Sequence, residues 1–167
     1  MTPLLKPIAA SLGTTDFVLR LCLAELNEED ARQRVRHNQG PSIAWQIGHL
    51  LDHRTKMLAL LGAPKENLYT ERFTDKGATE GSDYPSLAEF QRQWDATTAE
   101  LRAAMETATE ETLAQVVEKG PHGEKTALDQ LVFLCWHDAY HVGGVGLIQR
   151  EMGYRGPAEL AMAAMAA

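Results

Sequence analysis

Apolar residues recur at helical spacing through four long stretches of the chain, which polar segments rich in Gly and Pro separate. The stretches cover residues 3–27, 42–61, 86–107 and 126–152. Ser42, Ser86 and Thr126 stand where an N-cap residue is favoured, and Gly62 and Gly153 follow where a left-handed residue is favoured. The last stretch is apolar on nearly every face, which is typical of a helix at the centre of a fold.

Two connections between the helices differ in length and character. Residues 28–41 are polar and end in a Gly-Pro pair, a strong helix breaker. Residues 62–85 are long for a loop in one domain and could run the length of a bundle before the next helix begins. We expect Tyr69, Phe73 and Tyr84 to pin this long connection to the body of the protein.

The remaining segments complete an all-α architecture. Residues 110–117 are either a short helix or an extended piece, and residues 119–125 form a turn. The Ala/Met-rich tail, residues 154–167, is helix-prone, and it either docks on the bundle, docks on a second subunit or frays. The prediction is one domain over residues 1–167, a four-helix bundle with a long crossover connection between helices two and three.

Composition narrows the classes of partner. The net charge of −7 argues against nucleic acid, which needs a basic face. No stretch of about 18 residues lacks charged and strongly polar groups, so no membrane span is expected. Cys22 and Cys135 lie in apolar helical contexts, as reduced cysteines of a cytosolic protein do. With no charged-then-apolar leader, a cytoplasmic location is predicted.

Two pairs of histidines carry the candidate chemistry. His137 and His141 are four residues apart, as are His49 and His53, so each pair lies on one face of its helix. Such a pair can grip one metal ion, although paired histidines also occur on solvated faces and as hydrogen-bonded core residues. Arg54 next to His53 indicates that part of that helix faces water.

In a bundle, sites are built from side chains of facing helices, so His49 could meet His137 and His141. Three imidazoles on one ion leave coordination positions open, which distinguishes a catalytic site from a closed structural one. Imidazole ligands suit zinc, nickel, iron and copper, and zinc is the default. Gly143, Gly144 and Gly146 follow at once and either leave room for a ligand or admit a close helix.

The segments GPSIAWQIGHLLDH (40–53) and CWHDAYHVGGVGLIQREMG (135–153) resemble those of the DinB-like metal-binding four-helix bundles. This group includes proteins similar to bacillithiol- and mycothiol-dependent transferases and to mycothiol-dependent maleylpyruvate isomerase. The resemblance implies the crossover connection and a divalent metal bound by His49, His137 and His141. His53 matches no obligatory ligand of the family. Four roles stay open for His53: it supports a metal ligand without touching the metal, binds the metal as a fourth ligand, shuttles protons, or lies on the surface.

Three functions are compatible with such a site. The leading hypothesis is a metal-dependent enzyme acting on a small-molecule substrate, a thiol-dependent S-transferase with a low-molecular-weight thiol as cofactor. The first alternative is a metal-dependent hydrolase, which needs a general base near the metal. The second alternative is a non-catalytic, metal-stabilised stress-response bundle. The resemblance and the apolar tail also lead us to expect a homodimer.

Several polar groups lie near the candidate ligands in the sequence. Tyr140 is closest to the face of His137 and His141, and it either hydrogen bonds or transfers a proton there, or is a core tyrosine. Asp52 and Asp138 are expected to orient an imidazole from a second shell, as His53 also could. The two tryptophans of these motifs, Trp45 and Trp136, are expected in the core or as walls of a pocket.

Overall fold

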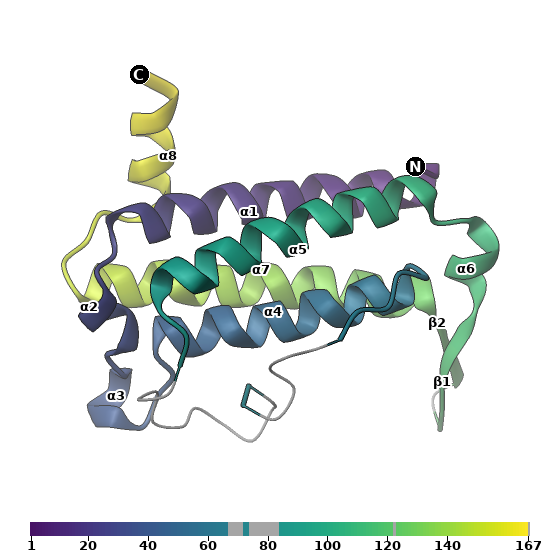
Figure 1. Cartoon of the computed structure of the whole chain (residues 1–167), viewed down its shortest axis with the longest axis horizontal. Helices are drawn as coiled ribbons and strands as arrows, with labels where there is room; N and C mark the ends of the chain where they lie inside the picture. Colours follow the sequence, from purple (N-terminus) through teal and green to yellow (C-terminus); the bar gives the residue numbers. More distant parts are fainter. Residues whose placement is uncertain (67–71, 74–83, 122, 167) are drawn as a thin grey trace.

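Four long helices form the body of the protein (Figure 1). They are α1 (Lys6–Glu25), α4 (Ile43–Leu60), α5 (Leu87–Thr107) and α7 (Ala127–Glu151). The computed structural model describes residues 1–66, 72–73, 84–121 and 123–166, except for the side chains of residues 36 and 38. The predicted all-α four-helix bundle is confirmed.

The helices begin and end at the residues that the sequence marks for those roles. The Ser42 hydroxyl accepts from the backbone N–H of Trp45 at 3.1 Å. Thr126 and Asp129 form a reciprocal capping box at the start of α7. Beyond the end of α7, Gly153 takes a φ of +88°, a conformation that a residue with a Cβ rarely adopts.

The connection between α4 and α5 is the predicted crossover. Figure 1 shows that α4 and α5 run in the same direction, so the chain must return along the bundle between them. In the described part of this connection, Phe73 and Tyr84 are buried, as expected for side chains that fix it to the body. Tyr69, the third residue expected in this role, lies outside the described residues.

Short elements fill the other connections. They are η1 (Pro3–Leu5), α2 (Glu28–Arg32), α3 (Val35–Asn38), α6 (Glu110–Ala114), β1 (Val116–Gly120), β2 (Gly123–Thr126) and α8 (Pro157–Ala166). The strands β1 and β2 form an antiparallel hairpin where the sequence predicted only a turn with an adjoining short helix or extended piece. The tail is helical, as its composition predicts. It projects from one end of the bundle, and Leu160 is its buried residue.

A buried polar layer crosses the core and joins all four long helices. Arg54 of α4 is 1% exposed, which corrects the expectation that it marks a water-facing side. Its guanidinium donates to both carboxylate oxygens of Asp138 on α7, at 3.0 and 2.9 Å. It also donates to Thr98 of α5 at 2.8 Å, while Thr15 of α1 donates to Asp138 at 2.6 Å. A buried cation is tolerated here because a carboxylate and hydroxyls satisfy it.

Helix α7 is less enclosed than its composition predicts. Apolar side chains along one of its faces remain in solvent: Val132, Phe133, Trp136, Tyr140 and Leu147. Trp136 is 60% exposed and Tyr140 is 65% exposed, so neither is a core residue. The reason is that α1 and α4, its main packing partners, cover only part of its circumference.

Two helical segments, Pro3–Glu25 and Ala127–Glu151, are long and apolar enough to cross a membrane by length and composition alone. Both belong to the bundle, where α1 and α7 pack against each other. The central helices of soluble proteins have the same length and composition, so these segments are weak evidence of a membrane span.

Candidate metal centre

Four imidazole rings gather between α4 and α7. His49 and His53 come from α4 and are buried, while His137 and His141 come from α7 and are half-buried. The ring centroid of His49 lies 5.0 Å from that of His137 and 4.7 Å from that of His141. The ring centroids of His53 and His137 are 4.2 Å apart. The cluster forms because each helix presents histidines one turn apart to its neighbour.

The spacing of the ring nitrogens suits a metal ion. His49, His53 and His137 each offer a nitrogen, and these atoms all lie within 4.8 Å of one another. The Nε2 atoms of His49 and His137 are 3.2 Å apart. Two imidazole ligands of one tetrahedral zinc ion, bound at the usual Zn–N distance, lie about 3.3 Å apart. The observed distance therefore fits two ligands of a single ion.

The Nδ1 atoms of His49 and His141 each lie within hydrogen-bonding distance of an oxygen acceptor. His49 Nδ1 lies 2.7 Å from the backbone carbonyl oxygen of Phe73, and His141 Nδ1 lies 3.1 Å from Oε1 of Gln46. Since both oxygens only accept, both Nδ1 atoms carry the proton, and the lone pair of each ring is on Nε2. Histidines that bind metals almost always have such an acceptor.

His53 is buried without a hydrogen bond. Neither of its ring nitrogens has a hydrogen-bonding partner among the residues that the structure describes. Burial, together with the neighbouring His49, lowers the pKa of His53 to about 2, so the ring is neutral at physiological pH. A buried polar group without a partner is costly, and a cation beside these nitrogens would remove that cost. The donor set thus fits a metal such as zinc.

The structure brings together all three ligands that the family resemblance implies, and it adds His53 to them. His49, His137 and His141 are mutual ring neighbours. The distances between ring nitrogens group His53 with His49 and His137 as ligands of one ion. The hydrogen bonds at Nδ1 instead favour His49 and His141, because these two rings have an oxygen acceptor. The assignment of the ligands to His49, His137 and His141 stays a prediction.

The expected neighbours of the histidines occupy other positions. Both carboxylate oxygens of Asp138 accept from Arg54, and one also accepts from Thr15, so the hydrogen bonds of Asp138 lead to these side chains rather than to an imidazole. The carboxylate of Asp52 is buried and lies 2.7 Å from Nζ of Lys56. Tyr140 meets His141 edge to face, with ring centroids 5.1 Å apart, and its role there stays a prediction.

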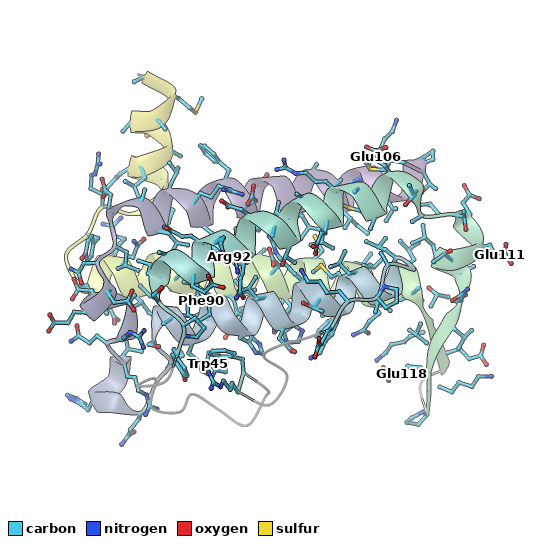
Figure 2. The ribbon with its side chains drawn as sticks, in the orientation of Figure 1. Trp45, Phe90, Arg92, Glu106, Glu111 and Glu118 are labelled. Atoms are coloured by element: carbon cyan, nitrogen blue, oxygen red, sulfur yellow. The ribbon has the colours of Figure 1, made fainter. Side chains whose placement is uncertain are left out.

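Aromatic rings border the cluster. Trp45 stacks on His49, with ring centroids 4.7 Å apart and an interplanar angle of 13°. Figure 2 shows Trp45 on the side of α4 away from α5. Trp45 is thus a buried wall of the site, whereas Trp136 is exposed and stacks on Tyr140 beside it.

Sequence reasoning did not identify the two acceptors. Gln46 lies within the GPSIAWQIGHLLDH segment, and a signal for it exists, since it stands three residues before His49 and therefore on the same side of the helix. Phe73 acts through its backbone carbonyl, which no residue type encodes. Only the course of the crossover connection brings this carbonyl to the ring.

A groove between α4, α7 and the hairpin begins about one turn from the histidines. It is lined by Lys56, Ala59, Leu60, Gln115, Val117, Ala127, Gln130 and Leu134. Lys56 follows His53 by three residues on α4, and Leu134 precedes His137 by three residues on α7. The lining combines apolar side chains with one cation and two amides, so it suits a small, partly polar molecule.

Comparisons with known proteins agree with the fold. The family model described as the DinB superfamily matches residues 15–145. A crystal structure of a conserved protein from Enterococcus faecalis superposes with a TM-score of 0.68 and 17% sequence identity, over 90% of this chain and 97% of that chain. At this identity the likeness concerns the fold alone. No curated protein matches the chain.

Proposed function

The chain belongs to the DinB superfamily, and on that premise we propose that it is a metal-dependent enzyme acting on small molecules. The reaction we propose is S-transfer: a low-molecular-weight thiol loses its proton to solvent, its sulfur forms a C–S bond to an electrophilic carbon, and the leaving group departs from that carbon with the electron pair of the broken bond. The observation that carries the proposal is the histidine cluster, with the Nε2 atoms of His49 and His137 3.2 Å apart. His49, His137 and His141 would hold the ion, with zinc the first candidate.

A divalent cation held by these histidines would act as a Lewis acid that favours the deprotonated form of a thiol at neutral pH. The protein's own contribution is orientation and access. Phe73 and Gln46 fix two of the rings, while the half-buried His137 and His141 leave the cluster open toward the exposed face of α7. The groove that starts near Leu134 would hold the electrophile.

The protein's own thiols are unsuited to the role of nucleophile. Cys22 and Cys135 are both buried, and neither belongs to the histidine cluster. Burial raises the pKa of the Cys22 thiol to about 11, so it is protonated at neutral pH. An external thiol is therefore the better source of the attacking sulfur.

Hydrolysis is the second candidate and has less support. It needs a general base near the metal, and the two carboxylates nearest the histidines in sequence are both engaged. Asp138 is paired with Arg54, and Asp52 with Lys56. A third candidate, a metal-stabilised bundle without catalysis, needs neither the groove nor an open position at the histidines.

Metal analysis of purified variants tests the ligand assignment. We expect His49→Ala, His137→Ala and His141→Ala each to lose most of the bound metal, because each removes one imidazole from a three-ligand site. His53→Ala should lose less, and His37→Ala, on the short helix α3, should lose none. Equal metal content in all five variants and the wild type would refute the site.

Thiol-dependent turnover tests the reaction. The zinc-loaded protein is incubated with monochlorobimane and, in turn, bacillithiol, glutathione and cysteine, and formation of the fluorescent thioether is followed. We expect turnover with at least one thiol, and its loss in His49→Ala. No turnover with any thiol at verified metal content would count against S-transfer and would favour the other two candidates.

A further inference from the structure

Gln46 on α4 contacts the imidazole of His141, one of the four rings of the histidine cluster. Its side chain is 3% exposed, and its Oε1 lies 3.1 Å from Nδ1 of His141 on α7. We infer that Gln46 is a positioning residue that holds His141 as a metal ligand, and that Gly144 is required to admit the Gln46 side chain. This inference rests on the proposed metal-binding function and concerns residues that have no direct contact with the metal in that proposal.

The hydrogen bond determines which nitrogen of His141 can bind a cation. An amide oxygen only accepts, so Nδ1 of His141 carries the proton and Nε2 keeps its lone pair. Without Gln46, both tautomers and other ring orientations become accessible. A ring with several accessible states must be ordered when metal binds, and the affinity falls accordingly.

Gly144 provides the space in which the amide lies. A Cβ placed on residue 144 would lie 2.9 Å from Oε1 of Gln46 and 3.5 Å from its Nε2. The first distance is too short, so a methyl group there would displace the amide from His141. Because the displaced atom is the end of a flexible side chain, the main effect should fall on the hydrogen bond rather than on the fold.

The neighbouring glycine provides a matched comparison. A Cβ placed on Gly143 meets nothing within 4 Å, although Gly143 and Gly144 are consecutive in α7. Helix propensity changes equally when either is replaced by Ala. Any difference between the two substitutions therefore reports the contact with Gln46.

The same arrangement recurs at His49, which supports a positioning role. Nδ1 of His49 donates to the carbonyl oxygen of Phe73, and a Cβ on Gly48 would lie 2.5 Å from the Phe73 ring. At both histidines, a helical glycine admits the residue that supplies the Nδ1 acceptor.

Zinc affinity, measured by competition with a chromophoric chelator, tests the inference on the full-length protein. We expect Gly144→Ala and Gln46→Met to weaken zinc binding about tenfold or more, as substitutions of groups that orient a ligand do. Gly143→Ala should bind as the wild type does. Gln46→Glu should keep most of the affinity, because a carboxylate oxygen restores the acceptor.

A second measurement is independent of metal. Long-range ¹H–¹⁵N NMR spectra of the metal-free protein report which ring nitrogen of His141 is protonated, and we expect Nδ1–H in the wild type and a mixture in Gly144→Ala. If the wild type binds zinc and both Gly144→Ala and Gln46→Met bind it equally well, the inference is overturned while the metal site stands. If the wild type binds no zinc, the proposed function fails, and with it the role of Gln46 toward a metal.

Discussion

Gly48 and Gly13 are both interior residues of long helices, but their surroundings differ. A Cβ on Gly48 would lie 2.5 Å from the ring of Phe73, which is fully buried, whereas a Cβ on Gly13 meets nothing within 4 Å. We expect Gly48→Ala to destabilise the fold by about 1–3 kcal/mol, because the Phe73 ring must move within a packed core. Urea denaturation followed by circular dichroism measures this.

Gly13→Ala is the control for helix propensity. It should leave the free energy of unfolding unchanged or raise it by up to about 1 kcal/mol, since Ala favours the helix and no contact opposes it. If Gly48→Ala were as stable as Gly13→Ala, the ring of Phe73 would be free to move, and the carbonyl that accepts from His49 would not be held by packing.

At the level of residues, local chemistry was predictable and partners distant in sequence were not. The caps at Ser42 and Thr126 and the histidine pairs follow from spacings of three or four residues, which a helix turns into contacts. The burial of Arg54 depends on Asp138, 84 residues away, and no local pattern reports such a pair. The exposure of Trp136 likewise depends on which helices pack beside α7.

At the level of elements, the ion pair between Arg54 of α4 and Asp138 of α7 aligns the two helices that carry the histidines. His53 is followed by Arg54, and His137 by Asp138, so on each helix the next residue points about 100° away from the imidazole. The histidines meet on one side of the helix pair and the ions meet on the other, where Trp94 of α5 lies under the guanidinium at 3.5 Å. The ion pair thereby fixes the rotation of both helices that present imidazoles.

Arg54 and Asp138 should be energetically coupled, because each side chain compensates the buried charge of the other. We expect Asp138→Leu or Arg54→Met alone to destabilise the protein by about 3–5 kcal/mol, because each leaves a buried charge without its partner. The double variant Arg54→Met/Asp138→Leu should lose less than the sum. Guanidinium denaturation of the four proteins in a double-mutant cycle measures the coupling, and strict additivity would contradict it.

At the level of the whole molecule, the order of the helices was implied by the resemblance rather than by periodicity. The length of residues 62–85 permitted a crossover, and the parallel α4 and α5 require one. The hairpin β1–β2 was missed because its strands are short and their residues are mostly exposed, so they lack the alternation that identifies a half-buried strand. The expected homodimer stays a prediction.

Metal binding should stabilise the folded protein as a whole. A ligand that binds only the native state adds free energy by mass action, about 2.7 kcal/mol at a free concentration 100 times its Kd. We therefore expect zinc to raise Tm in differential scanning calorimetry, and a chelator to reverse the rise. His49→Ala, which removes a buried ring of the cluster, should abolish the zinc-dependent part. If zinc raised the Tm of His49→Ala as much as that of the wild type, zinc would bind outside the histidine cluster.

The stacking of Trp45 on His49 has an optical consequence. The three indoles have distinct surroundings: Trp45 lies on an imidazole, Trp94 lies under a guanidinium and Trp136 is in solvent. A protein that keeps only the first, with Phe in place of the other two, emits from a ring in contact with the His49 imidazole. Its fluorescence is therefore an intrinsic, label-free signal of what that imidazole binds.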